Sequence, residues 1–233
     1  LVITKIYAIL SSQSVKMSYD TEGYLVATLM DVYGNVLGGK VVSVDLCGVR
    51  NLTTDENGQV NFTVDLPAGS YVANVSFDGD DNYLGSSRSV NVDVDKVSTE
   101  LNVSDISTTY NVAKYLVITL KDVGGNVLGG KELSVDFNGI KKSTTNENGQ
   151  VMISSYNLAP KNYVVAITFD GDENYLKSAT SANVLIKKAA PKLTASKKTF
   201  KVKTKTKKYT VTLKNNKNKV IKNAKLTLKV KTS

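Results

Sequence analysis

The chain has 233 residues, with 30 Lys and Arg against 21 Asp and Glu, and it contains no His, no Trp and a single Cys. The lack of His removes the commonest general base and a frequent metal ligand, and one Cys forms neither an intrachain disulfide nor a Cys-rich zinc site. The net charge of +9 is uneven: it is −6 over residues 1–96, −2 over 97–186 and +17 over 187–233. Affinity for an anionic partner therefore belongs to the last segment alone.

At its start the chain reads LVITKIYAIL, which is similar to the junction VLIKKAAPKLT at 184–194. We interpret residues 1–4 as the last strand of a preceding repeat. Lys5 interrupts the apolar run, so the segment is predicted to be neither a membrane span nor the core of a signal peptide.

An internal repeat organises the rest of the chain. Residues 24–40 read YLVATLMDVYGNVLGGK and residues 115–131 read YLVITLKDVGGNVLGGK, with 14 of 17 positions identical at an offset of 91. A third, Lys-rich copy begins near Lys192 and is interrupted at about half its length. Self-similarity at a fixed period indicates tandem modules. The predicted organisation is the end of a preceding repeat at 1–4, a first repeat at 5–96, a second at 97–187 and a truncated third at 188–233.

Each repeat shows apolar residues at every second position, which is typical of half-buried antiparallel strands. No stretch has the sustained spacing of an amphipathic helix. The residues predicted to face a core are Tyr71, Ala73, Val75 and Phe77 in the first copy, Leu116, Ile118, Leu120, Leu133, Val135, Phe137, Tyr163, Val165, Ile167 and Phe169 in the second, and Tyr209, Val211, Leu213, Leu226, Leu228 and Val230 in the third.

Gly, Asn and Asp separate these strands. Asn57-Gly58 and Asn148-Gly149 are predicted to form β-hairpins, because both residue types tolerate a positive φ. Further turns are predicted at 33–35, 78–80 and their second copies. Roughly seven strands in about 91 residues favour an all-β fold of tandem immunoglobulin-like antiparallel β-sandwich domains, the last one truncated.

Two tyrosines have alternative interpretations. Tyr71 and Tyr163 stand at the start of the penultimate strand of each repeat. Either they form a tyrosine corner, in which the hydroxyl bonds back to the chain, or they cap the edge of the core.

The motifs at 115–131, TTNENGQV at 144–151, NYVVAITFDGDENY at 162–175 and KYTVTLKNNKNKVIKNAKLTLKV at 208–230 resemble the bacterial-type immunoglobulin-like repeats of surface adhesins. The likeness is greatest to adhesin-like proteins of methanogenic archaea. The resemblance covers essentially the whole chain. It implies an extracellular stalk or adhesive array on a cell envelope.

Acidic turns are candidate calcium sites, because they gather hard oxygen ligands within four residues. The candidates are Asp78, Asp80 and Asp81 in the first copy and Asp170, Asp172 and Glu173 in the second. The alternative is that Asp and Gly only build the turn. No other cofactor is expected.

Four sequons are candidate glycosylation sites on an exported protein, at Asn51, Asn61, Asn74 and Asn102.

Cys47 follows an apolar strand and is predicted to be a small, partly buried hydrophobic residue. Lys40 and Lys131 share strand parity with inward residues, which raises the possibility of an intramolecular crosslink. We expect none, because an ammonium at a strand start reaches water.

The Lys-rich segment offers a contact surface for anionic envelope polymers, through Lys197, Lys198, Lys201, Lys203, Lys205, Lys207 and Lys208. A solvated strand face is the simpler interpretation. Nucleic acid is not expected, because stacking aromatics are sparse and no groove-entering helix is predicted.

These observations favour a non-enzymatic, extracellular cell-surface protein whose partners are envelope polymers, other cell surfaces and neighbouring repeats. The alternative is a carbohydrate- or wall-polymer-binding module that acts through the Lys-rich repeat. No nucleophile–base pair or phosphate loop is present. The truncated third copy is expected to pack poorly, because its strands cannot bury two sheets.

Overall fold

The computed structural model describes residues 4–137, 139–201, 203 and 205–229. It divides into two compact units, each of which is described by itself. The first holds the chain as far as Glu100 with Asp122–Asn126 and Asp170–Ser178, and the second holds Leu101–Lys121, Val127–Phe169 and the chain from Ala179 onward. Every regular element in the described ranges is a β-strand, and none of them is a helix of membrane-spanning length and apolarity.

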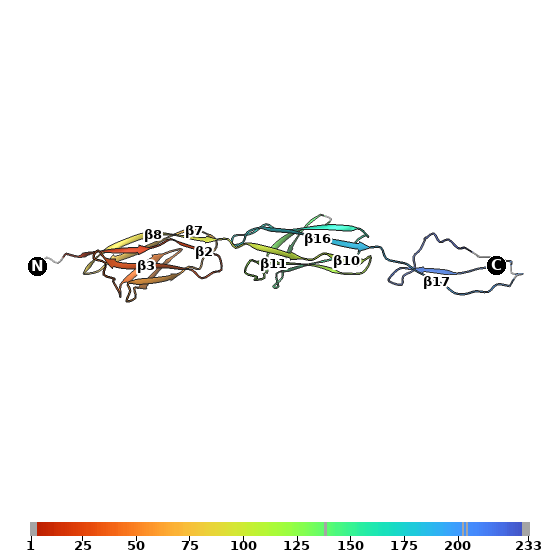
Figure 1. Cartoon of the computed structure of the whole chain (residues 1–233), viewed down its shortest axis with the longest axis horizontal. Coiled ribbons are helices and arrows are strands. Elements are labelled where there is room, and N and C mark those ends of the chain that lie inside the picture. The colour runs from red at the N-terminus through yellow and green to blue at the C-terminus, as the bar shows by residue number, and fades with distance from the viewer. Residues whose placement is uncertain (1–3, 138, 202, 204, 230–233) are drawn as a thin grey trace. The chain divides into compact units, whose positions relative to one another are not determined.

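Eight strands form the first unit (Figure 1, red to yellow). One layer has the order β5-β4-β7-β8, with β2 parallel to β8, and the other has the order β1-β3-β6. A short parallel pairing of β1 with β8 joins the two layers. The strands are β1 (Ile6–Ser12), β2 (Val15–Ser18), β3 (Tyr24–Asp31), β4 (Val41–Asp45), β5 (Val49–Thr53), β6 (Gln59–Thr63), β7 (Gly69–Gly79) and β8 (Tyr83–Asp95).

The next eight strands repeat this arrangement as a five-stranded sheet, β10-β16-β15-β12-β13, and a three-stranded sheet, β14-β11-β9. The predicted all-β class is therefore confirmed. The strands are β9 (Thr99–Val103), β10 (Ile106–Thr109), β11 (Tyr115–Asp122), β12 (Glu132–Asp136), β13 (Ile140–Thr144), β14 (Gln150–Ser154), β15 (Asn162–Phe169) and β16 (Ser178–Lys187).

The period-two patterns place the core as predicted. Leu25, Leu29, Val42, Val44 and Val75 are fully buried between the layers of the first unit. Each such side chain contributes about 1.5–3 kcal/mol relative to an exposed one. Of the predicted inward positions in the first two copies, Tyr71 and Phe137 are only half-buried and all others are buried, namely Ala73, Val75, Phe77, Leu116, Ile118, Leu120, Leu133, Val135, Tyr163, Val165, Ile167 and Phe169.

The Lys-rich segment holds one small antiparallel pair, β17 (Lys192–Ala195) with β18 (Val211–Lys214). The strand predicted around Val211 and Leu213 is thus confirmed. Leu226 and Leu228 are exposed and lie outside any strand, so their predicted strand is wrong, and Val230 lies outside the described residues. No described side chain from residue 187 to 229 is buried. Poor packing of the third copy is therefore confirmed, because two strands cannot enclose a core.

The prediction that residues 1–4 form the last strand of a preceding repeat falls mostly on residues outside the described ranges.

The prediction that the two Asn-Gly pairs form β-hairpins is wrong. The turn at 54–58 joins β5 to β6, which lie in different layers and do not pair. Only its glycine has a positive φ, 67° at Gly58 and 68° at Gly149 in the second copy. A Cβ at Gly58 would lie 2.5 Å from the carbonyl oxygen of Leu29, so the position also demands the smallest residue.

Cys47 corrects a second expectation. The hairpin of this region is the one between β4 and β5, and Cys47 lies at its tip with a φ of 55° and an exposed side chain. The buried position at the end of the apolar run belongs instead to Leu46. A left-handed backbone at a hairpin tip points the side chain to solvent, which strand alternation did not anticipate.

Tyrosine corners close each unit. The Tyr71 hydroxyl donates a hydrogen bond of 2.9 Å to the carbonyl oxygen of Pro67. The Tyr163 hydroxyl donates one of 3.0 Å to the carbonyl oxygen of Ala159. Both bonds span four residues back along the chain, so the tyrosine-corner alternative is confirmed.

We expect Tyr71→Phe and Tyr163→Phe each to lower the free energy of unfolding by about 0.5–1.5 kcal/mol, because each removes one hydroxyl–carbonyl hydrogen bond and keeps the ring. Urea denaturation followed by circular dichroism measures the loss. Tyr33→Phe, at a largely exposed side chain, is the matched control and should unfold like the wild type. Wild-type stability in both corner variants would contradict the assignment.

Candidate functional site

Several acidic side chains bond to the backbone of their own turns. Asp31 Oδ1 accepts the backbone N–H groups of Tyr33 and Asn35, each at 2.9 Å, and Asp31 Oδ2 accepts the Asn35 side-chain amide at 2.8 Å. These bonds, the Asn35 amide first, hold the pKa of Asp31 below its ordinary value. Asp55 Oδ1 accepts the N–H groups of Asn57 and Gln59 in the same way. Each side chain thereby replaces the backbone partner that a sheet would supply.

The pattern recurs along the chain. In the second copy Asp122, Asn146 and Asp172 accept the corresponding N–H groups at 2.8–3.0 Å. In the third, Asn215 accepts the N–H groups of Lys217 and Lys219 at 2.9 and 3.0 Å. An amide oxygen therefore serves the turn as well as a carboxylate.

This use of the acids bears on the predicted calcium sites. Asp80 Oδ1 accepts the N–H groups of Asn82 and Tyr83, and its Oδ2 binds a lysine. Asp78, Asp81, Asp170 and Glu173 are exposed. Over the described ranges, no three or more His, Cys, Asp or Glu side chains converge in a group that could hold a metal ion. Calcium binding at these turns stays a prediction.

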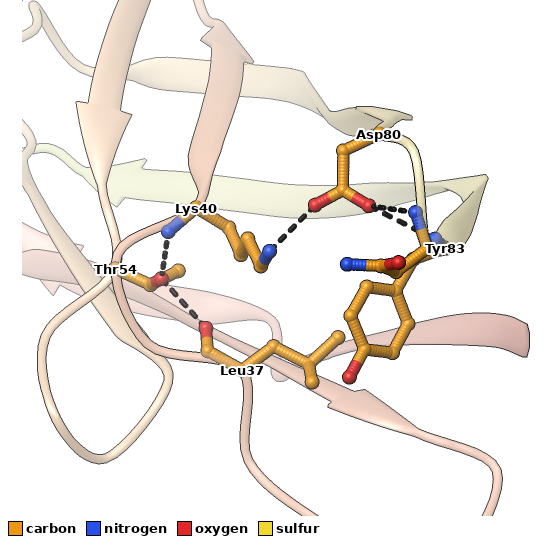
Figure 2. Close-up of polar contacts among 6 residues, drawn as sticks. Leu37, Lys40, Thr54, Asp80 and Tyr83 are labelled. Carbon is orange, nitrogen blue, oxygen red and sulfur yellow. Dashed lines mark hydrogen bonds and ion pairs between the residues drawn. The ribbon is translucent and has the colours of Figure 1, made fainter.

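The most developed polar cluster surrounds Lys40 at one end of the first unit (Figure 2). Lys40 Nζ donates to Asp80 Oδ2 at 2.5 Å and lies 5.1 Å from the centre of the Tyr83 ring. The backbone N–H of Lys40 donates to Thr54 Oγ1 at 2.9 Å. The Thr54 hydroxyl in turn donates to the carbonyl oxygen of Leu37 at 2.7 Å. Four segments, the β3–β4 loop, the end of β5, the β7–β8 turn and the start of β8, are thereby fastened together.

The chemistry of this cluster is that of an ion pair. The Lys40 ammonium, and after it the backbone N–H of Asn82, lowers the pKa of Asp80, so its carboxylate stays ionised. An ionised carboxylate is a poor electrophile, and an ammonium is no nucleophile until it loses a proton. The side chains are 25% and 30% exposed, so water reaches both. This arrangement supports the expectation that no crosslink forms.

The second unit repeats the hydrogen bonds that the threonine of this cluster makes to the backbone. The N–H of Lys131 donates to Thr145 Oγ1 at 2.9 Å, and the Thr145 hydroxyl donates to the carbonyl oxygen of Leu128 at 2.7 Å. The roles of Thr54 and Thr145 were missed from the sequence. The sequence did contain a signal for this role. Each threonine directly precedes the Asp or Asn that holds the next turn, and each follows the Gly-Gly pair by the same spacing.

The four sequon asparagines all lie exposed on strands. Asn51 Oδ1 accepts the hydroxyl of Ser43, and Asn74 Oδ1 accepts the hydroxyl of Ser89, both at 2.8 Å. Asn61 lies on β6 and Asn102 on β9. Their amides are accessible, and glycosylation stays a prediction.

All seven lysines that were predicted to contact anionic polymers are exposed. They are Lys197, Lys198, Lys201, Lys203, Lys205, Lys207 and Lys208. Contact with an anionic polymer likewise stays a prediction.

Scans find no protein-family model that matches the sequence and no significantly similar curated protein. Solved structures do match the fold. Invasin, a bacterial integrin-binding protein, matches with a TM-score of 0.52 and 15% identity, over 95% of this chain and 49% of that chain. The chain thus spans about half of that structure's length. Titin domains Z1Z2, solved with telethonin, match at 0.46 and 10% identity, over 79% and 98% of the two chains. The invasin likeness supports the immunoglobulin-like β-sandwich and, at this identity, the fold alone.

We expect the stabilising effect of Asp80 to depend on pH. Its folded-state pKa is depressed, so its contribution is present above the unfolded value of about 3.9 and is lost as pH falls through the folded value. Asp80→Asn keeps an oxygen for the turn and removes the charge. The variant should therefore be less stable than the wild type at pH 7, and the difference should vanish towards pH 2.

Thermal unfolding at a series of pH values measures this difference. Asp78→Asn, at an exposed neighbour in the same turn, is the matched control and should show little effect at any pH. A stability difference for Asp80→Asn that does not change between pH 7 and pH 2 would refute the ion pair's role.

Proposed function

We propose that the chain is a non-enzymatic segment of an extracellular surface protein, in which tandem immunoglobulin-like modules form a load-bearing stalk. The observation that carries the proposal is the parallel pairing of the second strand of each unit with its last strand. β2 runs parallel to β8, from Val15 opposite Val92 to Ser18 opposite Asp95. β10 runs parallel to β16 over the same number of residues.

Parallel pairing has a mechanical consequence. Tension applied through the chain ends of a unit pulls the beginning of this second strand and the end of the last strand in opposite directions. Because the two strands run side by side, this tension loads all their hydrogen bonds together in shear. A module built this way resists extension better than one whose bonds open one after another.

The chemistry of the side chains supports the absence of catalysis. The acidic side chains with several hydrogen bonds hold turns, as at Asp31, Asp55 and Asp80. The structural match to invasin, a bacterial integrin-binding protein, supports the fold on which an adhesive role is built. The repeat motifs favour an adhesin-like protein of an archaeal methanogen, and envelope polymers or other cell surfaces are its proposed partners.

Single-molecule force spectroscopy tests the load-bearing role. We expect two major unfolding events, each lengthening the chain by about 30 nm, since about 90 residues extend by ~3.3–3.6 Å apiece. Met17→Pro, in the middle of β2, should lower the force of only one event, because proline cannot donate a strand hydrogen bond. The second unit of the same molecule serves as the control. Unchanged forces for both events would contradict the proposal.

A further inference from the structure

A groove lies on the three-stranded layer of the first unit, where the first strand leaves it. β1 ends at Ser12 opposite Ala27, and the chain then crosses to the other layer as β2. Residues 24–26 of β3 are therefore left without a strand partner on that side. The groove has a volume of about 510 Å³, and it is lined by Ser11, Ser12, Gln13, Ser14, Val15, Lys16, Met17, Glu22, Gly23, Tyr24, Val26 and Thr28.

The second unit has the same groove, of about 400 Å³. Its seven lining residues, taken with the offset of 91, all fall on residues that line the first groove. The seven are Asn102, Val103, Ser104, Ile106, Tyr115, Val117 and Thr119.

The floors of the two grooves are identical. Each presents a tyrosine ring, a valine and a threonine on successive outward positions of one strand, Tyr24, Val26 and Thr28 in the first unit. Tyr24 and Tyr115 are 50% and 52% exposed, and Val26 and Val117 are 38% and 36% exposed. An exposed tyrosine ring beside a valine thus gives both grooves a small apolar floor at the same place.

The side chains that line the walls of the grooves indicate which kind of ligand would fit. They carry hydroxyl and amide groups, which both donate and accept hydrogen bonds. The first groove has one lysine and one glutamate, Lys16 and Glu22, and the second has no charged lining residue. A ligand with an apolar ring face, many hydroxyls and no net charge fits this lining. We propose that each groove binds a segment of a neutral polysaccharide, with a sugar ring stacked on Tyr24 or Tyr115.

An extended peptide that adds a strand beside β3 is the competing occupant, and the first groove opposes it. The Ser12 hydroxyl already donates a hydrogen bond of 2.7 Å to the carbonyl oxygen of Val26. An added strand would lose one of the few backbone acceptors available there.

This binding is distinct from the lysine surface and from the load-bearing role, and it depends on neither. In the third copy the positions of Tyr115 and Val117 are taken by Lys208 and Thr210. The stacking ring is absent there. Two weak grooves on one chain would act together on a polymer, because binding at one raises the effective concentration at the other.

Binding of the whole chain to an array of neutral and anionic glycans tests the proposal. The protein is made in a host that adds no N-linked sugar, so that Asn102 stays bare in the second groove. We expect binding to at least one neutral glycan. Tyr24→Ala or Tyr115→Ala alone should weaken it by roughly tenfold or more, and the double variant should abolish it. The double Tyr→Phe variant should bind like the wild type, because it keeps both rings.

Tyr33→Ala, at an exposed tyrosine outside both grooves, is the matched control and should leave binding unchanged. If the double alanine variant unfolds, Thr28→Arg with Thr119→Arg fills both floors while keeping the rings, and it should also abolish binding. The proposal is overturned if no neutral glycan is bound, if only anionic glycans are bound, if extended peptides compete for the site, or if folded groove variants bind like the wild type.

Discussion

A side-chain oxygen that accepts the backbone N–H groups of its own turn is the interaction on which these sandwiches depend. A β-sandwich satisfies most of its backbone groups within sheets, whereas some N–H groups in the turns between strands need a side-chain partner. Asp31, Asp55 and Asp80 supply that partner in the first unit. The threonine hydroxyl of Thr54 does the same for the loop beside them. The acidic residues are thereby committed to structure.

The other functional features follow from one step of the chain, the crossing of the first strand between layers. Beyond Ser12 the chain leaves β3 and pairs with β8 instead. That crossing creates the parallel pairing that we propose to carry tension. It also leaves the tyrosine end of β3 open as a groove. A single local departure from regular pairing thus underlies both the proposed mechanical role and the candidate binding surface, and the second unit repeats it.

Sequence periodicity predicted the fold class, the repeats and almost all of the core, because alternation of apolar residues directly reflects which face is buried. Prediction from the sequence failed where the same local sequence motif is compatible with two different arrangements of the strands that follow. Asn57-Gly58 encodes a tight turn, but the residues of a turn do not determine whether the next strand pairs or crosses to the other layer. The pair of Lys40 with Asp80 joins residues forty positions apart. Only the folded topology brings them together, and the same holds for the walls of the groove.

Amide hydrogen exchange in the β3–β4 loop tests the central claim most directly. Asp31→Ala removes the acceptor, whereas Asp31→Asn keeps an oxygen like the one that Asn215 supplies in the third copy. We predict that the amides of Tyr33 and Asn35 exchange about tenfold faster or more in the alanine variant, and that the asparagine variant stays close to the wild type. Equal protection in the wild type and the alanine variant would contradict the account.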